Sequence, residues 1–243
     1  MHKLSSISAF APCLNEEKNI PLLVAQFQEV LPKVAKKFEI IIVDDGSTDR
    51  TQKIVKQLIT KNPEVKYIHH PVNLGYGASL RSGITASQYD WIFFTDGDLQ
   101  FDLHELEEFT KETQKYNVII GYREHRADGS RRVLNAKLYK LFIDLLFRLH
   151  VRDIDCAFKL IRADLLKPLK LTSTGAFTSA EFLYRLKKKR VKFLQLPVTH
   201  LKRKFGTPTG NNPKVVLRAG LEALKLYISM KFGAYFSNTS RTS

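Results

Sequence analysis

The sequence is poor in the residues that mark several classes of protein. It has 2 cysteines among 243 residues, too few for a disulfide framework, so we expect a reducing, cytoplasmic compartment. The first ten residues hold no long apolar run, and we therefore expect no signal peptide there. No stretch reaches the roughly 18 uninterrupted apolar residues of a membrane-spanning helix. With 44% hydrophobic and 26% charged residues, the composition is typical of a folded, soluble protein.

Positive charge is concentrated in the second part of the chain. Residues 1–100 contain 11 Lys and Arg and 11 Asp and Glu, whereas residues 101–243 contain 28 and 13. The whole net charge of +15 therefore lies after residue 100. Such an excess predicts an anionic partner, which can be nucleic acid, a phosphorylated substrate or an acidic membrane surface. A solvated surface that only keeps the protein soluble is the alternative.

Apolar runs rich in β-formers alternate with helical patterns, which predicts an α/β fold with a doubly wound, mostly parallel sheet and helices on both faces. The predicted strands are Ile7–Ala11, Glu39–Val43, Val65–His69, Trp91–Thr95, Asn117–Ile120, Cys156–Ile161 and Val191–Pro197. The predicted helices are Ile20–Val34, Thr51–Thr60, Gly77–Ser87, Leu103–Lys115, Ala136–Leu149, Ser179–Lys189 and an amphipathic Lys214–Phe232.

Polar residues follow each of the first five predicted strands. Because ligands bind beyond the carboxyl ends of the strands in an open parallel sheet, five successive clusters predict a site at that edge. Ordinary loop polarity is the competing explanation for any one cluster. The clusters are Asn15–Glu17, Asp44–Asp49, Asn73–Gly77, Asp96–Gln100 and Gly121–Arg123.

Asp96 and Asp98 flank Gly97 after the fourth strand. In an extended segment, side chains two residues apart point the same way, and two carboxylates aimed at one point repel unless a cation or a proton lies between them. Hard oxygen ligands favour Mg²⁺ or Mn²⁺, which are commonly bound by one or two carboxylates together with substrate phosphates. We therefore expect a divalent cation here that neutralises a diphosphate.

The other polar residues allow more than one role. A carboxylate of the pair Asp44 and Asp45 can bind a ribose hydroxyl or a base edge, and Asp44 or Ser47 can instead cap the next helix. The turn from Asn73 to Gly77 lacks the spacing of dinucleotide-binding and P-loop motifs. Arg123, which follows the fifth strand, suits a phosphate.

Two further sets of residues complete the candidates. Asp153 and Asp155 are either general bases or ion-pair partners of Arg152. His69 and His70 lack metal-ligand spacing, so we interpret them as structural. No motif for a serine or cysteine nucleophile occurs.

Taken together, these motifs resemble family 2 glycosyltransferases of the GT-A fold. The resemblance covers roughly residues 6–205, and within the family it is strongest to the dolichol-phosphate mannosyltransferase branch, which transfers a sugar from a nucleotide donor to a polyprenyl phosphate. The motifs that carry it, in this order, are Pro12–Glu16, Val43–Asp49, Asn73–Gly77, Asp96–Gln100 and Gly121–Arg123.

The resemblance implies roles for individual residues. The residues implied to bind the donor are Pro12, Leu14, Glu16, Val43, Asp45, Asp96, Gly97 and Arg203. Asp96, Asp98 and Gln100 would hold the metal, while Arg123, Arg131 and Asn135 would bind the acceptor. Asp98, Arg123 and Asp155 are the implied catalytic residues, and Asp155 begins a segment that matches a later family motif. Glu181 matches an acidic residue of the family. The chain departs from the family pattern in having Leu14 in place of a Tyr and Thr209 in place of a Lys.

A polyprenyl phosphate acceptor is already an anion, so the resemblance implies an inverting transfer from GDP-mannose or a UDP-hexose without a strong base. Helices with apolar faces and basic residues would lie at the cytoplasmic face of the membrane. The same faces can instead serve core packing, a homo-oligomer or a membrane-protein partner.

Two alternatives stand beside this function. One is transfer to a soluble or glycan hydroxyl, with Asp153, Asp155 or Glu181 as general base. The other is a nucleotide-binding or nucleic-acid-binding module, although carboxylates at the ligand edge would repel a polyanion. We therefore expect no nucleic acid partner.

The expected organisation is a GT-A domain over residues 1–210, followed by an amphipathic helix and tail over residues 211–243. Within the domain, residues 1–122 would form the nucleotide-sugar half and residues 123–210 the acceptor half.

Overall fold

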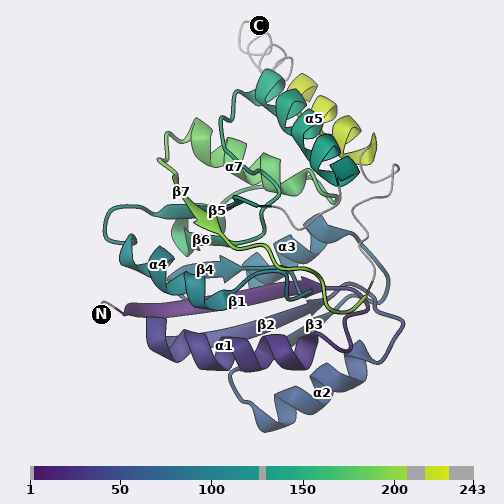
Figure 1. Ribbon diagram of the computed structural model, residues 1–243, viewed down its shortest axis with the longest axis vertical. Helices are drawn as coiled ribbons and strands as arrows, with labels where there is room; N and C mark the ends of the chain where they lie inside the picture. The colour runs from purple at the N-terminus through teal and green to yellow at the C-terminus, as the bar shows by residue number, and fades with distance from the viewer. Residues whose placement is uncertain (1–2, 126–129, 207–216, 230–243) are drawn as a thin grey trace, which may run out of the picture.

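The computed structural model describes residues 3–125, 130–206 and 217–229. For residues 130–135 it describes the helical backbone but not the side chains. A 7-stranded sheet in the order β3-β2-β1-β4-β6-β5-β7 forms the centre of the molecule (Figure 1). The strands are β1 (Leu4–Cys13), β2 (Ala35–Asp44), β3 (Val65–His69), β4 (Trp91–Phe94), β5 (Val118–Arg123), β6 (Lys159–Arg162) and β7 (Leu194–Val198).

Helices cover both faces of this sheet. They are α1 (Ile20–Val34), α2 (Thr51–Lys61), α3 (Tyr76–Ala86), the short 3₁₀ helix η1 (Leu103–Glu105), α4 (Leu106–Lys111), α5 (Ser130–Phe147), α6 (Ala163–Leu166) and α7 (Thr178–Lys188). Residues 217–229 are also helical. The α/β alternation predicted from the sequence is confirmed.

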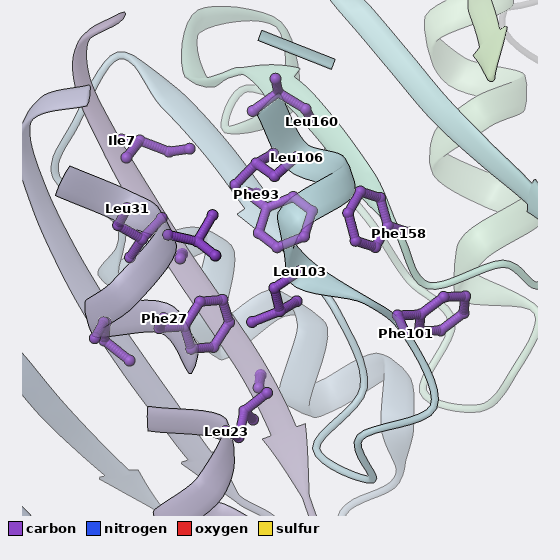
Figure 2. Packing of buried hydrophobic residues seen from close by; sticks show 14 of the residues in the cluster. Ile7, Leu23, Phe27, Leu31, Phe93, Phe101, Leu103, Leu106, Phe158 and Leu160 are labelled. Carbon is purple, nitrogen blue, oxygen red and sulfur yellow. The ribbon is translucent and has the colours of Figure 1, made fainter. Parts of the chain in front are cut away.

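Alternating residues of the central strands point to opposite faces, as the period of a β-strand requires. Phe93 lies in the core under α1 and η1, where Figure 2 shows Phe27 and Leu103 pointing toward it. Its neighbour Phe94 faces the second core, which contains side chains of α3, α5 and α7. Both faces of the sheet are therefore apolar, and this explains why its strands read as continuous hydrophobic runs.

Strand β6 departs from the parallel arrangement. It lies between β4 and β5 and runs antiparallel to both, with Phe94 opposite Lys159 and Ile120 also opposite Lys159. Because β6 runs in the reverse direction, the loop that precedes it reaches the same edge of the sheet as the loops that follow β1, β2, β4 and β5. This brings residues 153–156 to the predicted ligand edge.

Two local predictions are wrong. The helix predicted over Leu103–Lys115 is divided into η1 and α4 and ends at Lys111. The hydroxyls of Thr110 and Thr113 donate to the carbonyls of Glu107 and Thr110, at 2.9 and 2.7 Å, and such side-chain bonds compete with a continuous helix. The segment from Asp96 to Asp98 forms a turn after β4 rather than an extended continuation of it.

Candidate functional site

The loops after β1 and β2 are joined by side-chain to backbone hydrogen bonds. Asn15 has a φ of 57°, in the left-handed region that asparagine tolerates better than most residues. Its Oδ1 accepts from the amide of Thr48 at 2.8 Å, and its own amide donates to the Ser47 hydroxyl at 2.8 Å. The amide of Glu16 donates to the Thr51 hydroxyl at 2.9 Å. These bonds fix the two loops that carry Leu14, Glu16 and Asp45, three of the residues implied to bind the donor.

The two neighbouring carboxylates at the end of β2 have different environments. Asp44 is fully buried, accepts from the Tyr67 hydroxyl at 2.7 Å and caps the following turn through the Ser47 amide at 2.9 Å. Asp44 therefore closes the turn after β2. The helix-capping role considered for Asp44 is wrong, because the first residue of α2, Thr51, donates its amide to Asp49 Oδ1 at 2.9 Å. Asp45 accepts from the amides of Leu74 and Gly75, at 3.0 and 2.9 Å. Asp45 thus holds the glycine turn against the end of β2.

The glycine turn is closely packed by the loop before α7. Gly75 has a φ of 97°, which favours glycine. The amide of Gly77 donates to the carbonyl of Thr174 at 2.9 Å, and a Cβ on Gly77 would lie 2.0 Å from the Thr178 hydroxyl. A glycine is therefore required at position 77, because the backbone of the loop before α7 also approaches to within 3 Å of such a Cβ.

A tight turn presents Asp96 and Asp98 beyond β4. A Cβ on Gly97 would lie 2.9 Å from the carbonyl oxygen of Pro12, so the turn packs directly on the end of β1. Leu99 is buried at a φ of 59°, a backbone conformation that costs a non-glycine residue about 1–3 kcal/mol. The surrounding packing holds this strained conformation, which is typical of a functional site.

The electrostatics of the turn favour a bound cation. Burial, followed by the neighbouring charge of Asp98, raises the pKa of Asp96 to about 7. The positive charge of Arg123 and a hydrogen bond from Tyr76 act in the opposite direction. Burial and the charge of Asp96 in turn raise the pKa of Tyr76. Tyr76, which the sequence analysis did not single out, is thus a direct partner of the first implied metal ligand.

Arg203 connects this turn to the loop after β1. Its Nη1 lies 3.1 Å from Asp98 Oδ2, and its Nη2 donates to Glu16 Oε1. Burial raises the pKa of Glu16, against hydrogen bonds from Asn19 and Arg203. The structure therefore brings Arg203, Glu16 and Asp98 together, although they are far apart in the sequence.

Gln100 ties the same region to the segment before Arg203. The Gln100 Nε2 donates to the carbonyl of Leu201 at 3.0 Å, and the Leu201 amide donates to the Gln100 carbonyl at 2.8 Å. Because the Gln100 side-chain nitrogen donates to Leu201, the side-chain oxygen Oε1 is the atom of Gln100 that could bind a metal.

Arg123, at the end of β5, forms a buried ion pair with Asp153. Arg123 Nε and Nη2 donate to Asp153 Oδ2 and Oδ1 at 2.6 and 2.8 Å, and the two side chains are 5% and 11% exposed. Burial lowers the pKa of Arg123, but the bonds and charge of Asp153 outweigh this and raise it. The partner of Asp153 is therefore Arg123, whereas Arg152 stacks on the ring of Tyr122, 4.5 Å from its centroid.

Lys159, the last residue of the segment of the family motif that begins at Asp155, lies fully buried beneath this region. Its Nζ donates to the carbonyl of Ile154 at 3.2 Å and to that of Cys156. Burial lowers the pKa of Lys159, and the nearby charges of Asp153 and Asp155 counteract this. Lys159 thus holds the loop that contains Asp155 close to the site.

Glu181 has no exposed surface and is surrounded by donors. It accepts from the amides of Thr172 and Ser173, at 3.0 and 2.8 Å, and pairs with Arg185 at 2.7 Å. Burial raises the pKa of Glu181, but the hydrogen bonds from Ser173 and Arg185 outweigh it and lower it. The Glu181 carboxylate thus stabilises the loop before α7, which packs on the glycine turn.

The structure brings most of the implied donor and metal residues to one edge of the sheet. Pro12 and Val43 are paired neighbours in β1 and β2, and Leu14 lies partly exposed beside them. Arg131 and Asn135 fall outside the side chains that the structure describes, and Thr209 falls outside the described residues.

The carboxylates fit a divalent cation that shares its ligands with a substrate. Among the described residues, no group of three or more His, Cys, Asp or Glu side chains forms a closed metal site. Mg²⁺ and Mn²⁺ commonly take one or two carboxylates and complete their coordination with phosphates and water. Asp96 and Asp98, with the amide oxygen of Gln100, match such an open donor set.

A family model described as glycosyl transferase family 2 matches residues 8–169. The chain belongs to this family. It is 29% identical over 168 residues to a dolichyl-phosphate beta-glucosyltransferase of Trichomonas vaginalis, covering 61% of this chain and 49% of that protein. It is 27% identical over 169 residues to a dodecaprenyl-phosphate galacturonate synthase of Rhizobium johnstonii, covering 68% and 50%. The chain thus spans about half the length of these two relatives.

The fold of this family 2 member is shared with a solved structure. Glucosyl-3-phosphoglycerate synthase from Mycobacterium tuberculosis, in complex with Mg²⁺ and uridine diphosphate, superposes with a TM-score of 0.70 at 15% identity, covering 92% of this chain and 79% of that one. The GT-A fold predicted from the sequence is confirmed. Within the described part of this chain, no helix combines the length and apolar character needed to cross a membrane.

Proposed function

We propose that this family 2 member is an inverting glycosyltransferase that moves a sugar from a nucleotide-sugar donor, GDP-mannose or a UDP-hexose, to a polyprenyl phosphate at a membrane surface. The observation that carries the proposal is the pair of carboxylates, Asp96 and Asp98, at the carboxyl edge of the sheet. The names of the relatives, which act on dolichyl and dodecaprenyl phosphates, agree with it.

The donor half of the proposal rests on residues 1–122 together with Arg203. Asp45 and the paired residues Pro12 and Val43 offer a place for the base and ribose, and the Asp96–Asp98 turn offers a place for the diphosphate. A Mg²⁺ or Mn²⁺ ion held by Asp96, Asp98 and Gln100 would offset the charge of the departing diphosphate. Arg203 already pairs with Asp98 and Glu16, so its guanidinium lies where it can also bind a phosphate.

The acceptor half of the proposal depends on residues 123–210. Arg123 is the cationic residue of this half whose side-chain contacts support the proposal. Arg123 uses two of its donors on Asp153, and a guanidinium has five N–H groups. The remaining donors can bind an acceptor phosphate, and the role of Asp153 is then to orient Arg123. Arg131 and Asn135 complete the proposed phosphate site.

The state of the acidic residues favours a phosphate acceptor over a hydroxyl acceptor. Transfer to a hydroxyl needs a general base, whereas a phosphate is already a nucleophilic anion. Asp153 is bound by Arg123 in a bidentate pair, and Glu181 is saturated with donors that keep its pKa low. Asp155 is then the carboxylate to test as a general base for transfer to a hydroxyl. If it has that role, replacing it should remove one limb of the pH–rate profile.

Two adjacent helices support a membrane location for the acceptor. Residues 217–229 pack beside α5 (Figure 1), with the rings of Phe147 and Tyr227 6.1 Å apart. Each helix buries one apolar stripe and exposes a second. We call the exposed set the leucine surface, and it consists of Leu138, Leu141, Phe142, Leu145, Leu217, Leu221, Leu224 and Ile228.

The leucine surface is flanked by exposed basic residues, among them Lys137, Arg218 and Lys225. Apolar side chains that enter the acyl boundary, combined with cations that face anionic headgroups, are the features of an interfacial helix. We therefore propose peripheral membrane binding through this surface. Residues 211–216 and 230–243 of the predicted amphipathic helix and tail lie outside the described part.

The test of the donor function is thermal stabilisation by UDP and by GDP, each with and without Mn²⁺, in the wild type and in Asp98→Asn. A ligand that binds the folded state at 100 times its Kd adds about 2.7 kcal/mol of stability. We expect a Mn²⁺-dependent rise in Tm with one nucleotide in the wild type and little or none in Asp98→Asn. Asp164→Asn, at an exposed carboxylate paired with Arg162, is the matched control. No rise with either nucleotide would contradict glycosyl transfer.

A further inference from the structure

The imidazole of His70 lies directly behind the carboxylate of Asp45. His70 Nδ1 is 2.7 Å from Asp45 Oδ1, and Nε2 is 2.9 Å from the hydroxyl of Ser82 in α3. The side chain of His70 is 10% exposed, and its backbone amide donates to the Asp44 carbonyl at 2.9 Å. The ring is therefore fixed at both nitrogens and at the backbone.

These contacts determine which ring nitrogen of His70 carries a proton. A carboxylate accepts hydrogen bonds, so Nδ1 must donate to Asp45. The Ser82 hydroxyl can donate to Nε2 when the ring is neutral and can accept from it when the ring is charged. In either charge state Nδ1 keeps its proton. The hydrogen bond with Ser82 at Nε2 therefore stabilises the ring with Nδ1 as the donor to Asp45.

The carboxylate of Asp45 is left with capacity for one more donor. Oδ1 accepts from His70 and from the Leu74 amide at 3.0 Å, while Oδ2 accepts from the Gly75 amide at 2.9 Å. Two carboxylate oxygens offer about four acceptor positions. The hydrogen bonds of the described residues thus leave one position on Oδ2 for a ligand.

We propose that His70, supported by Ser82, is the positioning residue that orients Asp45 toward the base of the donor nucleotide. The inference rests on the proposed donor function. Uracil at N3 and guanine at N1 present an N–H to such an acceptor, whereas the corresponding ring nitrogens of cytosine and adenine are themselves acceptors. An Asp45 carboxylate fixed as an acceptor therefore selects uridine or guanosine diphosphates and rejects those of cytidine and adenosine.

The experiment compares two probes that both contain a diphosphate. The nucleotide also carries a ribose and a base, and inorganic pyrophosphate carries neither. Binding of the preferred nucleotide, UDP or GDP, and of inorganic pyrophosphate is measured by calorimetry with Mn²⁺. The proteins are the full-length wild type, His70→Leu, His70→Asn and Ser82→Ala. Asparagine retains a donor near the position of Nδ1, whereas leucine removes it.

We expect His70→Leu to weaken nucleotide binding about tenfold or more, the effect of losing one charge-assisted hydrogen bond, and to leave pyrophosphate binding unchanged. His70→Asn should recover most of the nucleotide affinity, and Ser82→Ala should lose about threefold, because the ring loses one of its restraints. CDP and ADP should bind no better to the wild type than pyrophosphate does.

Three results would overturn the proposal. Equal weakening of nucleotide and pyrophosphate in His70→Leu would show a general structural role. Unchanged nucleotide binding in both His70→Leu and Ser82→Ala would show that Asp45 needs no orientation. Wild-type protein that binds pyrophosphate with Mn²⁺ but no nucleotide would contradict the donor function itself, which separates that failure from a failure of His70 alone.

Discussion

At the scale of single residues, the ion pair between Arg123 and Asp153 shows how one buried charge depends on another. Both side chains are almost fully buried and share two hydrogen bonds. Breaking a buried pair by removing one partner leaves an uncompensated charge, which is strongly destabilising. Replacing both partners by apolar groups is often close to neutral.

We therefore predict that Asp153→Ala lowers the free energy of unfolding by about 3–5 kcal/mol. Arg123→Met combined with Asp153→Leu should restore most of this loss, because no isolated charge remains buried. Urea denaturation followed by circular dichroism measures both effects. The double variant should nevertheless be inactive in sugar transfer, since Arg123 is proposed to bind the acceptor phosphate. An active double variant would show that Arg123 serves stability alone.

At the scale of elements, the site depends on a loop held by α7. Glu181, in the first turn of α7, binds the amides of Thr172 and Ser173, and the carbonyl of Thr174 then accepts from Gly77 in the glycine turn. Helix 217–229 reaches the same loop, because Glu222 accepts from the Gly175 amide at 3.3 Å. Three elements thus meet at one loop beside Tyr76 and Asp96.

The lowered pKa of Glu181 predicts an acid-sensitive loop. A carboxylate with a folded-state pKa below its unfolded value stabilises the fold above the unfolded value of about 4.3, and this contribution is lost as the pH falls through the folded-state value. We predict that stability falls more steeply in the wild type than in Glu181→Gln as the pH falls below about 5. Denaturation at a series of pH values measures this, and parallel curves for the two proteins would contradict it.

At the scale of the whole molecule, the sheet separates two kinds of surface. The solvent-exposed positions of α1 and α2 on one side are mostly polar, while the opposite side of the molecule ends in the leucine surface of α5 and residues 217–229 (Figure 1). The net positive charge of the chain also lies after residue 100. The proposed acceptor half and the proposed membrane contact therefore belong to the same side of the protein.

We predict that the protein floats with liposomes containing anionic phospholipid. The variant Leu141→Ser, Leu145→Ser, Leu221→Ser should lose this binding, because it removes apolar side chains without changing the charge. Its matched control is Leu22→Ser, at an exposed leucine of α1 that is 46% accessible on the far side of the sheet. If the triple variant still floats, and instead turns from dimer to monomer in ultracentrifugation, the leucine surface is a dimer contact.

The amino-acid sequence by itself determined most of the helices and strands and the edge of the sheet at which the candidate site lies. Helix Ile20–Val34 and strand Val65–His69 have the predicted bounds, because hydrophobic period is a local property of the chain. The carboxylates after β4 were likewise found from their position behind a buried strand. Their roles, and the division of the chain at residue 210, stay predictions.

Only the tertiary structure decided which groups face one another. The antiparallel insertion of β6 brings Asp153 to Arg123, Arg203 crosses to Asp98 and Glu16, and the end of β3 places His70 behind Asp45. Each contact joins residues at least 25 positions apart in the chain. Their proximity depends on strand order and direction, which the pattern of one segment does not contain.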